Sequence, residues 1–171
     1  MMKDGIAYTG IPSAEELASC AGFPSAARMA RGPVAMIECL QCIPCNPCEH
    51  ACPTGAIRLG GEISKAPCLD EEKCIGCGRC IAQCPGLAIT VVNKAYAPGE
   101  ASLDFPFEYL PLPRTGDSVQ AVDRAGQSVC EAKVLAVIHS PENDGTAVIR
   151  IVFPLEYTDR VKSIKRLARE E

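Results

Sequence analysis

The sequence predicts an α+β protein made of two pseudo-symmetric halves, followed by a small antiparallel β domain and a C-terminal helix. Three observations predict this fold. Residues 42–53 are repeated at 74–85, with every cysteine matched at an offset of 32. Each repeat is typical of a loop, a short helix and a strand. Residues 118–153 then alternate as three short strands separated by turns.

The composition limits the size and class of the protein. With 171 residues, 14 Gly, 14 Pro and no Trp, the chain has room for one or two small domains. It carries 17 basic against 21 acidic residues, so we expect no nucleic-acid partner. Because no stretch reaches the roughly 18–20 apolar residues of a membrane span, we expect a cytoplasmic protein that does not bind membranes.

Residues 1–31 are predicted to form an N-terminal leader or docking arm. Ser13 and Glu16 form a capping box for a short helix that runs toward Cys20. The leader has no apolar stretch of signal-peptide length. A secreted disulfide framework is therefore a poor explanation for the twelve cysteines.

Residues 32–96 are predicted to form the cysteine-rich domain. Ten of the twelve cysteines lie between Cys39 and Cys84, which indicates shared ligation of a metal group. Residues 34–37 read as a short strand before the first repeat, and residues 67–69 occupy the equivalent place before the second.

The C-terminal part is predicted to contain a linker and a separate domain. Residues 97–113 carry four prolines among aromatic residues, which indicates an extended linker that adheres to other surfaces. Residues 114–171 are predicted to form the β domain, with strands at 118–122, 129–138 and 146–153. Pro154 can begin a last helix, with these basic residues mostly near its C-terminus: Arg160, Lys162, Lys165, Arg166 and Arg169.

The run C-x2-C-x2-C-x3-C-P occurs twice in the chain. Thiolates are soft ligands, and a cuboidal iron–sulfur core needs four of them around one body. Two-residue gaps let one loop supply three sulfurs, while the fourth must come from elsewhere. Zinc is the main alternative, but a tetrahedral zinc site gains nothing from the third cysteine or from the final proline.

These runs resemble those of bacterial-type two-[4Fe–4S] ferredoxins, in which the fourth cysteine of each run serves the other cluster. The resemblance implies a ferredoxin-like domain with two [4Fe–4S] clusters. One cluster would be held by Cys42, Cys45, Cys48 and Cys84, and the other by Cys74, Cys77, Cys80 and Cys52.

The first loop departs from the ferredoxin pattern. Cys39 lies three residues before Cys42 and competes with it as a ligand, although alignment of the two repeats favours Cys42. Pro44 and Pro47 leave fewer N–H donors for cluster sulfurs, so we expect the first cluster to have the lower potential. His50 is interpreted as a surface residue. Cys20, Cys68 and Cys130 are interpreted as buried small apolar residues and not as ligands.

A narrower resemblance rests on residues 37–39 and 43–49. The segments IEC and IPCNPCE are similar to those of the ferredoxin-like small subunits of multisubunit flavin-dependent dehydrogenases acting on proline or hydroxyproline. The position of Cys42 need not be cysteine in that group. The resemblance implies a non-catalytic electron-transfer subunit, in a hetero-oligomer with flavin-containing dehydrogenase subunits.

Two other functions stay open at this level. The chain can be a free-standing soluble ferredoxin, or a redox-sensing or structural iron–sulfur binding module. No nucleotide-binding glycine motif or catalytic triad was identified. The leader and the C-terminal part are expected to contact the flavoprotein, with the following apolar residues contributing: Phe105, Phe107, Tyr109 and Leu110.

Overall fold

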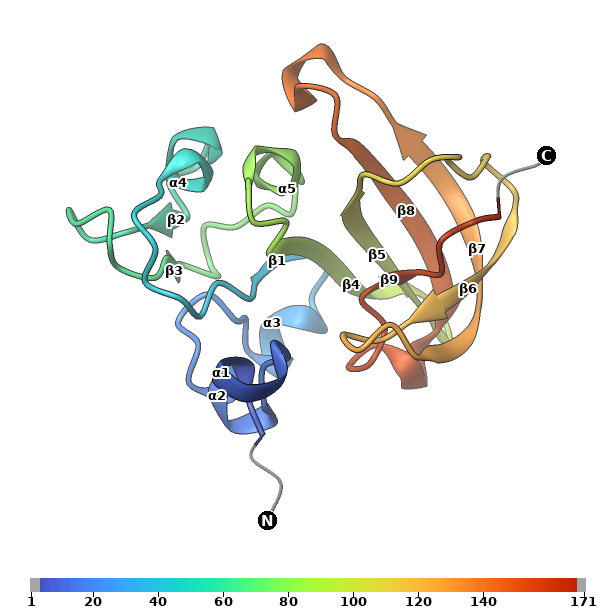
Figure 1. Ribbon diagram of the computed structural model, residues 1–171, viewed down its shortest axis with the longest axis horizontal. Coiled ribbons are helices and arrows are strands. Elements are labelled where there is room, and N and C mark those ends of the chain that lie inside the picture. The colour runs from blue at the N-terminus through green and yellow to red at the C-terminus, as the bar shows by residue number, and fades with distance from the viewer. Residues whose placement is uncertain (1–3, 169–171) are drawn as a thin grey trace.

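The computed structural model describes residues 4–168 and is a mixed α+β structure dominated by an antiparallel sheet (Figure 1). The seven-stranded sheet has the order β1-β4-β5-β8-β7-β6-β9, and β2 pairs with β3 in a second, two-stranded sheet. The strands are β1 Val34–Ile37, β2 Ile57–Arg58, β3 Cys68–Leu69, β4 Ile89–Ala97, β5 Glu100–Phe107, β6 Ser118–Val122, β7 Ser128–Ile138, β8 Ala147–Pro154 and β9 Ser163–Ile164. The helices are α1 Ile6–Thr9, α2 Ala14–Ala18, α3 Ala26–Met29, α4 Pro47–Ala51 and α5 Arg79–Gln83, with 3-10 turns η1 Pro141–Asn143 and η2 Leu155–Tyr157.

The leader contains the predicted capping box. The Ser13 side chain accepts a hydrogen bond from the Glu16 N–H, and the Glu16 carboxylate accepts one from the Ser13 N–H, which together cap α2. The chain after α2 then joins two strands of the cysteine-rich part. The Ile37 N–H donates to the Gly22 carbonyl at 3.0 Å and the Leu69 N–H to the Ala21 carbonyl at 2.9 Å.

Strands β1 and β4 separate two hydrophobic cores. Successive side chains of a strand point to opposite faces of the sheet. On one face Val34, Met36 and Val92 join the large core of the C-terminal strands. On the other face Ile37 and Ile89 join a smaller core that includes buried cysteines of α4 and α5. All four residues of β1 are therefore buried.

Two strand pairings correspond between the repeats. β1 pairs with β4 through Ile37 and Ile89, and β3 pairs with β2 through Leu69 and Ile57. Ile37 is equivalent to Leu69 in the repeat alignment, and Ile57 is equivalent to Ile89. The first strand of each half therefore pairs with the last strand of the other half, in the same register.

The predicted linker over residues 97–113 is wrong for residues 100–107, which form the interior strand β5. This strand pairs with β4 on one side and with β8 on the other. Phe105 and Phe107 are buried in the large core. Pro106 lies beyond the last β4–β5 pair, Val91 with Asp104, and is paired only with β8, so the sheet tolerates its missing N–H.

The three predicted C-terminal strands are confirmed as β6, β7 and β8, but the predicted final helix is wrong. Within the described part, Pro154 is followed by the short turn η2 and then by β9. Val161 and Ile164 are buried in the large core, and β9 pairs with β6. Core packing therefore overrides the helical spacing of the basic residues, of which Arg169 lies outside the described residues.

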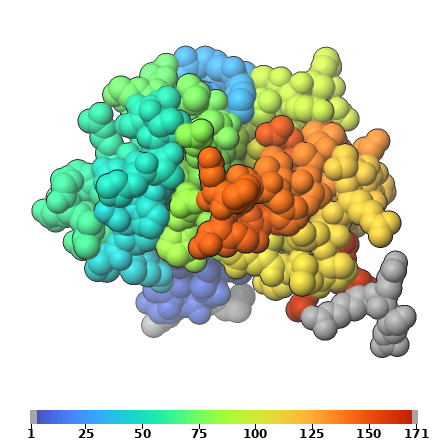
Figure 2. Space-filling model, turned by 90° about the horizontal axis from the view of Figure 1, so that it is seen from above, coloured from blue at the N-terminus to red at the C-terminus, as the bar shows by residue number. Residues whose placement is uncertain are grey.

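The tip of the β7–β8 hairpin reaches the cysteine-rich part. The view from above shows this tip against the segments of α4 and α5 (Figure 2). Gln83 at the end of α5 donates from Nε2 to the carbonyl of Glu142 at 2.6 Å. The C-terminal strands thus contact the helices that carry the cysteines.

Candidate metal centres

The helices α4 and α5 position matching cysteines. Each helix buries one cysteine, Cys48 in α4 and Cys80 in α5. Each ends on a cysteine in extended conformation, with φ and ψ of −79° and 108° at Cys52 and of −84° and 108° at Cys84. A proline follows both, and the residue before proline avoids the helical region. The proline of each run therefore favours the end of the helix at the last cysteine.

Backbone N–H groups point at both of these terminal sulfurs. The Ala56 N–H donates to Cys52 Sγ at 3.2 Å, and the Ala88 N–H donates to Cys84 Sγ at 3.4 Å. Such hydrogen bonds stabilise thiolate over thiol. Cys74 accepts a similar bond, from the Ala35 N–H of β1 at 3.4 Å.

The second group of thiols contains the four residues expected from the sequence. Burial raises the pKa of the Cys80 thiol to about 12, and the neighbouring Cys74, Cys77 and Cys52 contribute to the rise. Cys52 comes from the first repeat, as expected if the fourth cysteine of each run serves the other cluster.

The first group departs from the expected set. Burial raises the pKa of the Cys48 thiol to about 11, with contributions from Cys84, Cys45 and Cys39. Cys84 comes from the second repeat. The thiol neighbours of Cys48 include Cys39, whereas alignment of the repeats favours Cys42 as the ligand.

Cys39 and Cys42 differ in their surroundings. Cys39 is half-buried and packs against the smaller core, as do Cys52, Cys74 and Cys84. Cys42 is exposed and belongs to neither core cluster. Exposure alone does not decide between them, because Cys77 is also exposed.

The path of the loop does distinguish them. In the second repeat, Gly76 has a φ of +65° and its backbone lies so close to Pro33 that an added Cβ would be 2.5 Å from the Pro33 carbonyl oxygen. The first repeat has Pro44 at this position. The proline ring excludes positive φ values. The loop after Cys42 therefore does not repeat the path of the loop after Cys74.

An arginine that no motif marks holds the second loop in place. Arg28 of α3 donates from Nη2 to the carbonyls of Pro33 at 3.0 Å and Cys74 at 2.6 Å, and from Nε to the carbonyl of Glu71 at 2.8 Å. No sequence pattern indicates this role, because Arg28 is far from Cys74 along the chain and its bonds go to main-chain atoms.

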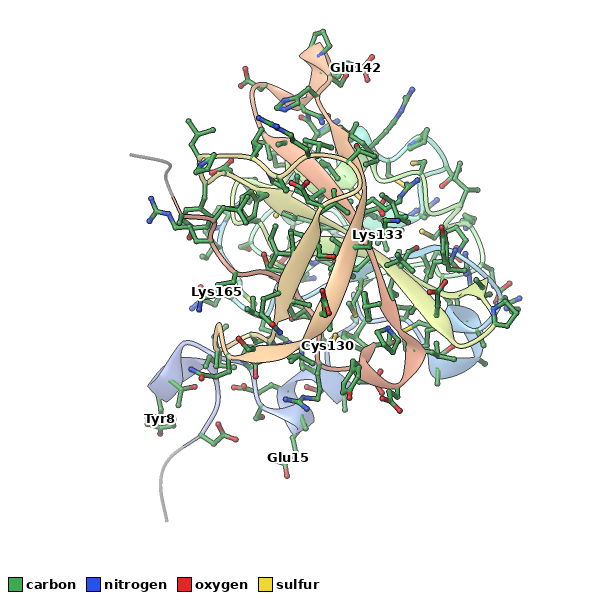
Figure 3. The ribbon with its side chains drawn as sticks, turned by 90° about the vertical axis from the view of Figure 1, so that its right-hand side faces the viewer. Tyr8, Glu15, Cys130, Lys133, Glu142 and Lys165 are labelled. Carbon is green, nitrogen blue, oxygen red and sulfur yellow. The ribbon has the colours of Figure 1, made fainter. Side chains whose placement is uncertain are left out.

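The remaining candidates are not among the neighbours of Cys48 or Cys80, although Cys20 lies near Cys39. His50 is exposed, with its Nε2 3.2 Å from the Asn46 amide, as its interpretation as a surface residue expects. Cys130 lies on β7 in the C-terminal part (Figure 3) and packs against the large core. Cys20 donates from Sγ to the carbonyl of Ile37 at 3.2 Å. Cys68 is exposed on β3, so its interpretation as a buried apolar residue is wrong.

The thiols are not arranged for a single metal ion. Among residues 4–168, no three or more His, Cys, Asp or Glu side chains converge on a point that would hold one such ion. In a [4Fe–4S] cluster each thiolate binds a different iron, so its ligands need not converge on one point. No helix in the same range is both long and apolar enough to cross a bilayer.

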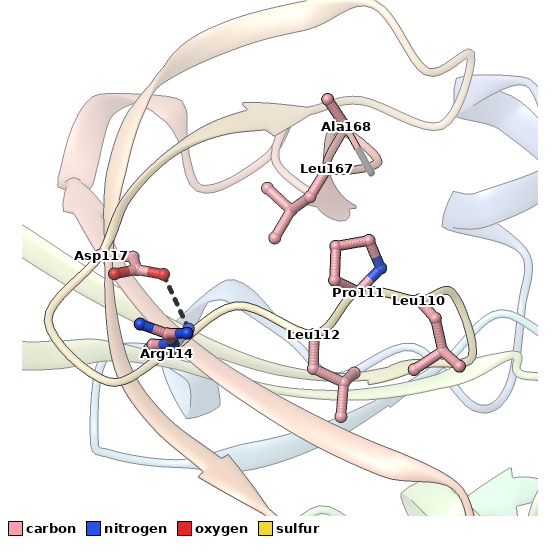
Figure 4. Close-up of a pocket in the computed structure, with 7 residues that line it drawn as sticks. All are labelled: Leu110, Pro111, Leu112, Arg114, Asp117, Leu167 and Ala168. Carbon is pink, nitrogen blue, oxygen red and sulfur yellow. Dashed lines mark hydrogen bonds between the residues drawn. The ribbon is translucent and has the colours of Figure 1, made fainter. Parts of the chain in front are cut away.

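The four apolar residues expected to contact a partner differ in their exposure to solvent. Phe105 and Phe107 are buried in their own core, so that expectation is wrong for them. Tyr109 and Leu110 are exposed. Leu110 is among the residues around an open cavity of about 870 Å³, lined also by Pro111, Leu112, Arg114, Asp117, Leu167 and Ala168 (Figure 4).

Comparison with known proteins identifies the cysteine-rich part. A family model described as 4Fe-4S dicluster domain matches residues 41–95. The chain is 36% identical to Protein Pixie of Drosophila melanogaster over 85 residues, which are 46% of this chain and 14% of that protein. It is 35% identical to ABC transporter E family member 1 of Arabidopsis thaliana over 86 residues, 44% of this chain and 14% of that protein.

A third relative is F(420)H(2) dehydrogenase subunit I of Methanosarcina mazei, 42% identical over 48 residues that make up 28% of this chain and 27% of that subunit. The chain thus spans only a small part of each of these relatives. No solved structure matches the chain.

The donor set fits the cofactor that the family model names. Two groups of four thiols, each completed by a cysteine from the other repeat, suit two soft, four-coordinate cuboidal clusters. With twelve cysteines in the chain and the dicluster match over residues 41–95, the protein contains a ferredoxin-like domain that carries two [4Fe–4S] clusters.

Proposed function

We propose that this chain is a non-catalytic iron–sulfur subunit that passes electrons to or from a flavoprotein partner in a cytoplasmic oxidoreductase complex. The dicluster match supports electron transfer. The similarity to one subunit of an F(420)H(2) dehydrogenase supports a place in a larger assembly. Within this proposal the clusters supply one-electron chemistry, and the chain holds and insulates them.

The observation that carries the proposal is the crossed grouping of buried thiols. Cys84 follows α5 but is a neighbour of Cys48 in α4, and Cys52 follows α4 but is a neighbour of Cys80 in α5. Two clusters held this way share a wall formed by both helices. Adjacent clusters are the arrangement that lets an electron enter at one and leave from the other.

We further propose that the two halves are pseudo-symmetric about this pair of clusters. The matching register of the β1–β4 and β3–β2 pairs supports this arrangement. So do the matching backbone angles at Cys52 and Cys84 and the N–H bonds from Ala56 and Ala88 to their sulfurs.

For the ligands, we propose Cys74, Cys77, Cys80 and Cys52 at the second cluster, as the sequence predicts. At the first cluster we propose Cys39, Cys45, Cys48 and Cys84, with Cys39 in place of Cys42. The proximity of Cys39 to Cys48 and the inability of Pro44 to repeat the Gly76 turn support this choice. Cys42 would then be a free thiol at the surface.

Single serine variants test the ligand choice. Each is purified anaerobically, and its iron, acid-labile sulfide and reduced EPR spectrum are compared with those of the unaltered protein, which should hold about eight irons. Cys39→Ser should lose the first cluster, whereas Cys42→Ser should keep both. Cys42 should also react with iodoacetamide in the folded protein. The reverse ranking would restore Cys42 as the ligand.

The function is tested by isolating the native protein with its partners. We expect two reversible low-potential couples, a co-purifying chain that contains flavin, and reduction or oxidation of the clusters by that flavin. Isolation of the chain by itself, with both couples intact, would instead identify a free-standing ferredoxin. Absence of any reversible couple would exclude electron transfer.

A further inference from the structure

A buried carboxylate lies between the first cysteine loop and the C-terminal strands. Glu38 directly follows β1, and its side chain is 14% exposed. Arg124, in the turn between β6 and β7, donates from Nε to Glu38 Oε2 at 2.8 Å and from Nη2 to Oε1 at 2.7 Å. Lys162, just before β9, forms an ion pair with the same Oε1 and contacts Met36 Sδ at 3.3 Å.

The charges of this cluster, Glu38 with Arg124 and Lys162, do not balance. The Glu38 carboxylate accepts two hydrogen bonds from the Arg124 guanidinium and forms an ion pair with Lys162. Burial lowers the pKa of Lys162 to about 8, so this side chain is mostly protonated at pH 7. The guanidinium is always charged. Two cations therefore surround one largely buried anion, while Asp159, which also faces Lys162, is 81% exposed and pairs with Lys94.

This charge cluster is connected to both ends of the first ligand set. Glu38 is the residue before Cys39. Its N–H donates to the carbonyl of Ala88 at 2.9 Å, and the Ala88 N–H donates in turn to Cys84 Sγ at 3.4 Å. Glu38 therefore lies next to one proposed ligand, Cys39, in the sequence and is linked to another, Cys84, through two hydrogen bonds.

The second repeat has the same backbone connection without the buried cations. Asp70, which is equivalent to Glu38 in the repeat alignment, donates from its N–H to the carbonyl of Ala56 at 2.7 Å, and the Ala56 N–H donates to Cys52 Sγ at 3.2 Å. Its carboxylate pairs only locally with Lys73, whose side chain is 50% exposed. Water screens that pair strongly. The two cluster environments thus differ in net buried charge.

We propose that Arg124 and Lys162 raise the reduction potential of the first cluster above that of the second. A cluster gains one negative charge on reduction, and a nearby buried cation stabilises the reduced form. This inference rests on the proposed function, because it concerns clusters that take up electrons. It reverses the order expected from the prolines of the first loop, which lower the number of N–H donors but add no charge.

The size of the effect follows from Coulomb's law. A unit charge roughly 10 Å from a cluster, at an effective dielectric constant of about 20, changes the ratio of reduced to oxidised cluster roughly 15-fold at a fixed potential. Loss of the Lys162 charge should therefore be measurable by redox titration.

The test is a potentiometric EPR titration of the holoprotein and three variants. Lys162→Met removes a cation but keeps apolar bulk, and should lower the potential of one cluster while the other stays constant. Glu38→Gln removes the anion and should raise the potential of that same cluster. Lys162→Arg should restore the unaltered value. A Cys77→Ser background, which should retain only the first cluster, identifies which potential moves.

Lys73→Met is the matched control, and it should move neither potential, because its ion pair is exposed. The proposal is overturned if Lys162→Met shifts neither potential or both equally. It is also overturned if Glu38→Gln and Lys162→Met shift the potential in the same direction, since a structural disturbance would do that. If the unaltered protein lacks two reversible couples, the proposed function has failed first, so the two failures are distinguishable.

Discussion

Replacing Gly76 by alanine should destabilise the second cysteine loop through two separable effects. The residue has a φ of +65°, and a left-handed conformation costs a non-glycine residue roughly 1–2 kcal/mol. The added Cβ would also meet the carbonyl oxygen of Pro33 at 2.5 Å and its Cβ at 2.6 Å. These atoms directly precede β1, and Arg28 holds Pro33 in place, so they cannot move aside freely.

Gly78→Ala is the matched control. Gly78 has a φ of +77°, but its added Cβ would meet nothing closer than Ile81 Cδ1 at 3.5 Å, an ordinary contact. Both variants should share the conformational cost. The steric overlap should cost Gly76→Ala about 1–3 kcal/mol more. If the whole difference appears in the rate at which the cysteine loop opens, Gly76→Ala should lose its cluster roughly 5- to 140-fold faster than Gly78→Ala.

The assay follows cluster loss by visible absorbance, anaerobically, in urea with an iron chelator. We expect Gly76→Ala to bleach fastest, Gly78→Ala to be intermediate and the unaltered protein to be slowest. Equal rates for the two variants would refute the close approach of Gly76 to Pro33 as a determinant of the loop. They would also weaken the argument that Pro44 forces a different path on the first loop.

Two further predictions concern buried charges. The potential of the first cluster should fall as the pH rises through about 8, the value to which burial lowers the pKa of Lys162, because this cation, which Glu38, Asp159 and Arg124 face, becomes neutral. A redox titration between pH 7 and pH 9 that shows the same slope for both clusters would contradict this. Asp104→Asn should lower the free energy of unfolding by about 1–3 kcal/mol. The Asp104 side chain is 7% exposed and accepts two hydrogen bonds from Arg150, across β5 and β8. An unchanged urea midpoint for anaerobic unfolding would contradict this prediction.

The sequence predicts local features of this fold well where short-range patterns decide them. The α2 capping box and the three C-terminal strands depend on neighbouring residues and are confirmed. The linker prediction fails around Pro106, because the strand there is set by pairing with β8, a distant segment of the chain (Pro106 with Val148). The final helix fails because Val161 and Ile164 are fixed by the core and not by helical spacing.

The cysteine motifs also illustrate the limit of local patterns. The resemblance of the two cysteine runs to those of ferredoxins predicts two clusters, and the dicluster match bears this out. The choice between Cys39 and Cys42 depends on loop backbone, which the repeat alignment does not contain. A proline opposite Gly76 is visible in the sequence, but its meaning needs the φ angle of that glycine. The partners of Glu38 come from the β6–β7 turn and the segment before β9, beyond the reach of any local motif.

Strands β1 and β4, which lie between the two hydrophobic cores, limit when during synthesis the protein can bind its clusters. During translation, Cys84 leaves the ribosome before any residue of β5 or β8. Val34, Met36 and Val92 then have no core to enter, so the strands that support both cysteine loops are not yet buried on their second face. We therefore expect stable cluster insertion to await synthesis through β8, with the thiols kept reduced until then. A fragment ending at Asn93 would expose this face of β1 and β4 and should not retain iron.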